Sequence, residues 1–267
     1  MLITSVQNPR IKAAAKLRER RTRDQLGHCL IDGAREIERA WQANVRLLEI
    51  FVCEELCHTS AAADLIARLS AAAAANLDQV TPPVFAKLAY GERAEGIIAV
   101  AETPRRALGD LKLPPDALVA VVEGCEKPGN LGAIVRSADG AGVAAVIAAD
   151  PRTDLYNPNA IRASLGTIFA LPLCAATSAE TLHWLRERNA EIFAARVDGA
   201  RLYTAANFRP MSAIVLGSEA RGLSEVWQGP DITPIQLPML GCADSLNVAA
   251  TAAVLFYEAA RQRASGD

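Results

Sequence analysis

Apolar runs without polar interruption alternate with longer, periodic segments through the second half of the chain. The runs ALVAVVE at 117–123, VAAVIAA at 143–149 and AIVLGS at 213–218 have the length of strands. Such strands are typically buried on both faces, and helices between them favour a parallel sheet in an α/β fold. The other elements predicted here are helix 131–141, helix 158–165, strand 168–173, helix 178–189, strand 191–197, a short helix near 222–227, strand 232–237 and a long helix over 245–262.

The N-terminal half also alternates, but with shorter strands and more charge, which predicts a small α/β domain. Its predicted elements are helix 8–24, strand 28–32, helix 33–43, strand 47–53, helix 60–75, a helix near 82–89 and strand 96–101. The segment ETPRRALGDLKLPPD then brings prolines, a glycine and mixed charge between two strands. We therefore predict a first domain over 1–103, a linker over 104–116 and a second domain over 117–267.

Composition restricts the class of protein. The chain has 267 residues, of which 51% are apolar, so it can bury a sizeable core. No apolar run approaches the roughly 20 residues of a membrane span, and the N-terminus lacks the order of a signal peptide, so we expect a cytosolic protein. The six cysteines are scattered, which favours free thiols. Cys53, Cys57 and His58 lie close together, but no second ligand pair follows at the spacing of a zinc site, so we predict no metal.

The net charge of −2 conceals a basic N-terminal segment. Residues 1–23 hold seven Lys and Arg against a single acidic residue, Glu19, so this segment carries +6 and the remainder −8. A local basic helix can contact RNA phosphates without a basic protein overall. A solvated amphipathic helix is the alternative, because Ile11 and Ala14 also fit helical spacing. The residues predicted to bind RNA are Arg10, Lys12, Lys16, Arg20, Arg21 and Arg23.

Common nucleotide-binding and hydrolase motifs do not account for the second half. Gly140, Gly142 and Ala145 spell GxGxxA, but they follow a predicted helix and lead into a strand, whereas a dinucleotide loop follows a strand and opens a helix. The P-loop pattern GxxxxGK[ST] is absent, and so is the GxSxG elbow of the α/β hydrolases.

Three separated segments place Gly or Asn beside an apolar run: NLGAIVR at 130–136, LGSEARGLS at 216–224 and LPMLGCADSLNVA at 237–249. Backbone N–H groups exposed at such strand ends and helix starts can hold a polar ligand. Each segment also has a plain structural explanation. Arg136 could pair with Asp139 on the surface, and serines such as Ser245 could cap helices.

Taken together, the three segments resemble the motifs of the TrmH/SpoU branch of the SPOUT methyltransferases, over residues 118–262. Two departures, ATAAV at 250–254 and Leu237 where Ile is more usual, remove no polar group. LGTIFALPL at 165–173 resembles a further family segment, and residues 5–40 look like the start of the ribosomal-protein-L30e-like substrate-binding domain of many rRNA-modifying members.

The resemblance implies a fold, a reaction and partners. The second domain would be a SPOUT α/β domain whose parallel sheet contains a deep trefoil knot, preceded by the small L30e-like α/β domain. The activity would be transfer of a methyl group from S-adenosylmethionine to a ribose 2′-hydroxyl of RNA by a homodimer. The N-terminal domain favours 23S rRNA as the substrate. The alternatives are a tRNA ribose 2′-O-methyltransferase and a non-catalytic RNA-binding or ribosome-binding protein that keeps the fold.

The resemblance also carries residue roles. Arg136 matches the residue treated as catalytic, and Glu219 would organise the loop around it. A guanidinium, whose pKa exceeds about 12, is a poor base, so we expect Arg136 to stabilise the developing alkoxide and an adjacent phosphate. The residues expected at the reacting centre are Arg136, Asn130, Glu219, Ser245 and Asn247. The residues expected at the cofactor are Leu216, Gly217, Leu237, Met239 and Leu246.

Overall fold

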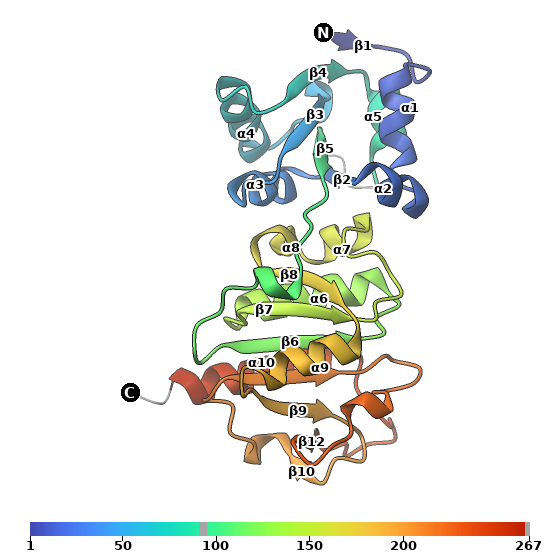
Figure 1. Cartoon of the computed structure of the whole chain (residues 1–267). Coiled ribbons are helices and arrows are strands. Elements are labelled where there is room, and N and C mark those ends of the chain that lie inside the picture. The colour runs from blue at the N-terminus through green and yellow to red at the C-terminus, as the bar shows by residue number, and fades with distance from the viewer. Residues whose placement is uncertain (91–94, 265–267) are drawn as a thin grey trace. The chain divides into compact units, whose positions relative to one another are not determined.

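The computed structural model describes residues 1–90 and 95–264, and the chain forms two compact units (Figure 1). Unit 1 comprises Met1–Pro104 together with Tyr156–Ala170, and unit 2 comprises Arg105–Leu155 together with Leu171–Asp267. The segment at 156–170 belongs by sequence to the predicted second domain, yet it packs inside unit 1.

Unit 1 is built on a five-stranded sheet with the order β1-β4-β3-β5-β2. Its strands are β1 (Leu2–Ile3), β2 (His28–Asp32), β3 (Leu47–Val52), β4 (Asn76–Val80) and β5 (Ile97–Glu102). β5 runs antiparallel to both β2 and β3, and the other pairs are parallel. Its helices are α1 (Pro9–Lys16), α2 (Arg20–Leu26), α3 (Ala34–Gln42), α4 (Ser60–Ala71), α5 (Pro82–Leu88), α7 (Pro158–Ala163) and α8 (Thr167–Ala170), with a 3-10 turn η1 (Glu54–Leu56). α1 packs with α5 and α3 packs with α4, on opposite sides of the sheet in Figure 1.

The segment at 156–170 is held in unit 1 by close backbone contacts. Arg39 on α3 donates to the carbonyl oxygen of Leu165 at 2.7 Å, and Arg162 on α7 donates to that of Tyr90 at 2.9 Å. Gly166, with a φ of +81°, lies so near α3 that an added Cβ would come within 2.8 Å of the Cα of Glu36. Only glycine tolerates both the conformation and the contact.

The expected helix over 8–24 is two helices. The break falls between α1 and α2, and Arg23 stabilises it by donating Nη1 to the carbonyl oxygens of Leu17 at 2.6 Å and Arg18 at 2.7 Å. Arg23 is only 4% exposed. The structure therefore corrects its assignment as an RNA-binding residue, because this guanidinium is occupied by the protein's own backbone.

Two further predictions for unit 1 differ from the structure. The helix expected over 60–75 ends at Ala71, and Ala73 takes a φ of +48° that turns the chain toward β4. The strand expected over 168–173 is instead helix α8, followed by a strand that begins only at Leu173. An apolar run of this length fits a helix and a strand equally well, so hydrophobic periodicity could not separate them.

Asp32, at the end of β2, is a titratable group within unit 1. The pKa of Asp32 is raised to about 6, mainly by burial and also by the charges of Glu36 and Glu95, against the opposite effects of the Tyr90 N–H at 2.7 Å and of Arg162. A carboxyl whose pKa is higher in the folded than in the unfolded state binds its proton more tightly when folded. Its contribution to stability is therefore present at low pH and is lost as the pH rises through 6.

We predict that Asp32→Asn removes this pH dependence. The contribution of Asp32 to the free energy of unfolding should fall by up to about 3 kcal/mol between pH 4 and 7, since each pH unit between the two pKa values is worth about 1.4 kcal/mol. Urea denaturation at several pH values measures this change in the free energy of unfolding. Asp24→Asn, at an exposed carboxylate, serves as the control and should keep the wild-type slope. Equal slopes in the Asp32 variant and the wild type would contradict the prediction.

Unit 2 is built on a seven-stranded, all-parallel sheet with the order β10-β12-β9-β11-β6-β7-β8. Its strands are β6 (Leu118–Glu123), β7 (Ala145–Ala149), β8 (Leu173–Ala176), β9 (Glu191–Ala195), β10 (Arg201–Leu202), β11 (Ser212–Leu216) and β12 (Ile232–Gln236). Its helices are α6 (Pro128–Gly140), α9 (Ser178–Arg186) and α10 (Val248–Ala264), with 3-10 turns η2 (Leu108–Asp110), η3 (Tyr203–Ala205) and η4 (Glu225–Trp227). α6 and α10 pack against each other, and α9 shares a core cluster with Val119 and Val121 of β6. The parallel α/β sheet predicted from the apolar runs is confirmed.

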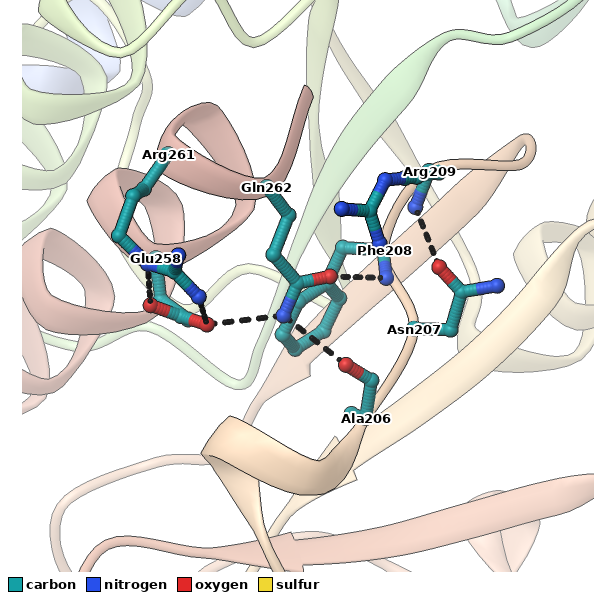
Figure 2. Close-up of polar contacts among 7 residues, drawn as sticks. All are labelled: Ala206, Asn207, Phe208, Arg209, Glu258, Arg261 and Gln262. Atoms are coloured by element: carbon teal, nitrogen blue, oxygen red, sulfur yellow. Dashed lines mark hydrogen bonds and ion pairs between the residues drawn. The ribbon is translucent and has the colours of Figure 1, made fainter. Parts of the chain in front are cut away.

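Gln262 of α10 ties the helix to the segment that precedes β11 (Figure 2). Its Nε2 donates to the carbonyl oxygen of Ala206 at 3.0 Å and to Glu258 at 2.8 Å, while its Oε1 accepts the N–H of Phe208 at 2.9 Å. Gln262 is 5% exposed and Phe208 fully buried. The amide thus satisfies backbone groups that have no access to water.

We predict that Gln262→Leu lowers the free energy of unfolding by about 2–4 kcal/mol, because leucine fills the space but leaves the Phe208 N–H and the Ala206 carbonyl unpaired. Equilibrium denaturation measures this loss. Arg186→Gln is the control in the same unit, since it removes an ion pair with Asp231 whose two side chains are 48% and 44% exposed, worth about 1 kcal/mol or less. Equal stabilities of the two variants would show that the buried amide contributes little.

Candidate functional site

A cavity of about 290 Å³ lies at the carboxyl ends of β6 and β11, where parallel α/β sheets commonly bind ligands. Three stretches of chain form its wall: the turn from β6 into α6, the loop after β11 and the start of α10. The lining residues are Val122, Cys125, Glu126, Lys127, Asn130, Gly217, Ser218, Glu219, Ala220 and Val248. Segments far apart in sequence therefore meet at one place.

Glu219 connects these segments. Its Oε1 accepts hydrogen bonds from the Nδ2 of Asn130 and, at 3.2 Å, from the Nδ2 of Asn247, and its Oε2 lies 2.5 Å from the Nζ of Lys127. The hydrogen bond and charge of Glu219 raise the pKa of Lys127. Because both carboxylate oxygens are occupied by donors, Glu219 orients its neighbours.

Gly217 is required by the shape of the loop after β11. The loop folds back at Gly222, whose φ is +65°, and Ser218 and Gly222 exchange backbone hydrogen bonds of 3.1 and 2.9 Å. A Cβ on Gly217 would lie 2.3 Å from the carbonyl carbon of Gly222. Gly217 was expected at the cofactor. In the structure the backbone of Gly222 and Leu223 packs against it, in the space that a side chain would need.

Cys125 lines the cavity, but its chemistry there is passive. It is 5% exposed, and burial raises the pKa of its thiol to about 11, with the charge of Glu219 acting in the same direction. A thiol with this pKa stays protonated near neutral pH and is a weak nucleophile. Cys125 therefore contributes shape and apolar surface to the site.

The side chains around the cavity are of mixed charge and chemistry. Within residues 1–90 and 95–264, no group of three or more His, Cys, Asp or Glu is placed to hold a metal ion. The site offers two carboxylates, two amides and an ammonium group around a cavity, a set suited to binding and orienting a polar organic ligand.

Comparison with known proteins gives this site a family. The model of the SpoU rRNA Methylase family matches residues 117–257, which include every lining residue. The chain belongs to the SpoU rRNA methylase family. The model of the MRM3-like substrate binding domain matches residues 8–99, which confirms a substrate-binding domain in the N-terminal part.

Individual SpoU proteins resemble the chain over different lengths. A crystal structure of an RNA 2′-O ribose methyltransferase covers 99% of this chain and 100% of its own, with a TM-score of 0.87 and 44% identity. The SpoU methyltransferase AviRb from Streptomyces viridochromogenes, solved in complex with the cofactor AdoMet, has a TM-score of 0.88 and 27% identity, covering 98% of this chain and 100% of its own. A 23S rRNA (uridine(2479)-2′-O)-methyltransferase from Streptomyces viridochromogenes is 33% identical over 185 residues, which are 66% of this chain but only 64% of that protein.

The SpoU motif residues divide into two groups in the structure. Asn130, Gly217, Glu219 and Asn247 lie together at the cavity. The other motif residues lie elsewhere: Arg136 is exposed on α6, Ser245 is exposed, Leu237 and Met239 are half-buried, Leu246 is 43% exposed and Leu216 is 1% exposed within β11. The roles of this second group remain predictions from the family motifs.

Asn130 and Arg136 leave α6 in different directions. They are six residues apart, and at about 100° per residue their side chains differ by roughly 240° around the helix axis. Asn130 points to Glu219. Within the described part of the chain, Arg136 makes no hydrogen bond or ion pair. The two side chains therefore leave different faces of α6.

Lys127 and Cys125 are cavity residues that the sequence did not single out for a role. They lie three and five residues before the first motif, and Val248 immediately follows the asparagine of the third. Their position close to the motifs was the only hint of a role in the site. Nothing in the sequence around Lys127 or Cys125 distinguishes them from ordinary surface or core residues.

Among the predicted RNA-binding residues, Lys12, Lys16, Arg20 and Arg21 are exposed. Arg10 is instead engaged by carboxylates, with its Nη1 2.7 Å from Asp78 and its Nε 3.3 Å from Glu49. An arginine paired in this way has less free charge to offer a phosphate.

Proposed function

We propose that this chain transfers the methyl group of S-adenosylmethionine to a ribose 2′-hydroxyl of 23S rRNA. The convergence of Asn130, Glu219 and Asn247, one from each SpoU motif, at a single cavity carries the proposal. The substrate class is supported by the SpoU rRNA methylase and substrate-binding domain matches and by the 23S rRNA relative.

The cavity, together with the motif loops beside it, is the proposed cofactor site. Its volume of about 290 Å³ is close to the lower end of small-ligand sites, about 300–1,000 Å³. We assign cofactor contacts to the main chain of Leu216, Gly217, Leu237, Met239 and Leu246. The bound cofactor supplies a methyl carbon on a sulfonium, an electrophile that needs no metal activation.

The protein's own residues position the nucleophile. A 2′-hydroxyl must lie in line with the methyl carbon, and orientation of this kind accounts for much of the rate of such transfers. Ser245, Asn247 and Asn130 orient the ribose. Arg136 holds the neighbouring phosphate and stabilises the developing negative charge on the 2′-oxygen, and solvent accepts the proton.

The active unit is a homodimer. Arg136 is exposed on α6, and on the adjoining α10 the apolar side chains of Val254 and Tyr257 are 37% and 56% exposed. Pairing two copies through these helices covers the apolar surface and presents Arg136 of one copy to the partner's cavity. Sedimentation equilibrium of the purified protein measures its mass in solution, which should be twice that of one chain.

RNA approaches along the exposed basic side chains of α1 and α2. Phosphate contacts would come from Lys12, Lys16, Arg20 and Arg21. Such contacts carry no sequence information, so these residues do not select the nucleotide that is methylated. The family also implies a trefoil knot in unit 2 and a cytosolic location. The described residues contain no helix long and apolar enough to cross a membrane.

Incubation with tritiated S-adenosylmethionine and separate pools of unmodified rRNA and tRNA tests the function. The expected result is labelled rRNA in which one bond resists alkaline cleavage, because a methylated 2′-oxygen cannot attack the neighbouring phosphate. Label confined to tRNA would keep the chemistry and overturn the substrate. Cofactor binding without label in either pool would favour a non-catalytic RNA-binding protein.

A further inference from the structure

Glu123, the last residue of β6, is a buried carboxylate outside the cavity. It is 7% exposed and accepts four hydrogen bonds. Its Oε1 receives the Oγ of Ser178 at 2.6 Å, the Oγ of Ser224 at 2.7 Å and the indole Nε1 of Trp227 at 2.9 Å; its Oε2 receives the backbone N–H of Ser224 at 2.7 Å. Four donors on one carboxylate fill nearly all of its acceptor sites.

The donors to Glu123 come from two different elements. Ser178 is the first residue of α9, and its own N–H is also held by Asp150 at 2.8 Å. Ser224 and Trp227 instead lie at the far end of the loop that follows β11. Glu123 therefore fastens this loop to the sheet at a point well beyond Glu219.

The loop after β11 has two attachments, and the cavity wall lies between them. Its near end continues from β11 through Gly217, and its far end is held at Ser224 by Glu123. The residues of the loop that line the cavity are Gly217, Ser218, Glu219 and Ala220. If the far attachment is lost, these residues can leave the conformation in which Glu219 meets Asn130 and Asn247.

A carboxylate, which accepts at both oxygens, suits this arrangement. The N–H groups of Ser224 and Trp227 contact different oxygens of Glu123, so an amide in its place would turn its NH₂ toward one of them and leave that donor without an acceptor. Hydrogen bonds to a charged acceptor are also stronger than neutral ones.

We propose that Glu123 is a positioning residue that sets the affinity for S-adenosylmethionine by holding the 217–227 loop in its binding conformation. The proposal rests on the proposed function only for the identity of the cofactor. The apparent dissociation constant rises in proportion as the fraction of molecules in the binding conformation falls.

The test is calorimetric titration of S-adenosylmethionine and its demethylated product into the full-length protein. Glu123→Gln is expected to raise both dissociation constants about 10-fold or more, the ratio that corresponds to about 1.4 kcal/mol. Glu191→Gln, at an exposed glutamate of the same unit, should leave them unchanged. A change of less than about twofold in the folded Glu123 variant would overturn the proposal.

Two serines provide a matched pair that separates positioning from general stability. Ser224→Ala and Ser178→Ala each remove one hydroxyl donor from the same oxygen of Glu123, but only Ser224 belongs to the loop. We expect Ser178→Ala to lose at least as much thermal stability, because Ser178 is 3% exposed whereas Ser224 is exposed, and a rise in the dissociation constant of about threefold or more confined to Ser224→Ala. Equal dissociation constants would mean that Glu123 acts on stability alone. This pair also serves if Glu123→Gln fails to fold.

Failure of the proposed function gives a different result. A wild-type protein that binds S-adenosylmethionine and methylates no RNA contradicts the activity, and the dissociation constants of the variants still decide the role of Glu123. Conversely, an active wild type with unchanged affinity in Glu123→Gln contradicts only the positioning role.

Discussion

Arg136→Lys is expected to lower kcat by about 100-fold or more at saturating RNA and S-adenosylmethionine, the loss typical when a donor to developing negative charge is removed. Lysine keeps the charge but not the planar fork that holds a phosphate and an alkoxide together. The dissociation constant for S-adenosylmethionine should stay within about twofold of the wild type, because Arg136 does not line the cavity. Single-turnover methylation and calorimetry measure the two quantities.

Arg209→Lys, at an exposed arginine of the same unit, is the control and should keep full turnover. Near-normal kcat in Arg136→Lys would contradict the assigned role. Mixing Arg136→Ala with Asn247→Ala protein then tests the dimer. If Arg136 serves the partner's cavity, a mixed dimer contains one intact site and recovers activity. If it serves its own chain, each site carries a defect and activity stays lost.

Gly217→Ala is expected to weaken cofactor binding about 100-fold. The added Cβ would lie within 2.6 Å of three backbone atoms of Gly222 and Leu223, and backbone atoms cannot rotate away as a side chain does. The loop must move, and the cavity wall moves with it. At the upper end of the roughly 1–3 kcal/mol that overpacking costs, affinity falls about 100-fold.

Gly109→Ala is the matched control, since a Cβ at that position meets nothing within 4 Å. Calorimetry of both variants measures affinity, and circular dichroism checks that each is folded. Wild-type affinity in Gly217→Ala would show that the loop can relax without disturbing the cavity. That outcome would also weaken the case for its anchoring by Glu123.

The sheet of unit 2 could be predicted because its strands are uninterrupted apolar runs. β6, β7 and β11 fall within two residues of the segments expected from ALVAVVE, VAAVIAA and AIVLGS. β1 and β10 escaped prediction because strands of two residues have no period. β4 escaped because NLDQV carries polar residues at alternate and adjacent positions alike.

Charge in the sequence was a less reliable guide than apolar pattern. Arg23 and its neighbour Arg21 look equivalent in RRTRD, yet one is buried on backbone carbonyls and the other is exposed. The difference arises from the break between α1 and α2, which the regular spacing of Ile11 and Ala14 did not indicate.

The candidate site was predictable only as far as the motifs reach. Asn130, Glu219 and Asn247 were expected near the reaction, and the structure brings them together. Glu123 gave no such signal, because a single Glu at the end of an apolar run is ordinary in sequence. Its importance lies in partners 55, 101 and 104 residues away, which only the folded chain reveals.

Unit 1 is formed by two separate segments of the chain, and this affects how the protein folds during synthesis. The unit includes Tyr156–Ala170, so it cannot be completed when the ribosome has reached Pro104. β6, α6 and β7 must emerge first, a delay of several seconds at about 5–20 residues per second. Throughout that interval the surface of α3 that receives Leu165 and Gly166 stays uncovered on the nascent chain.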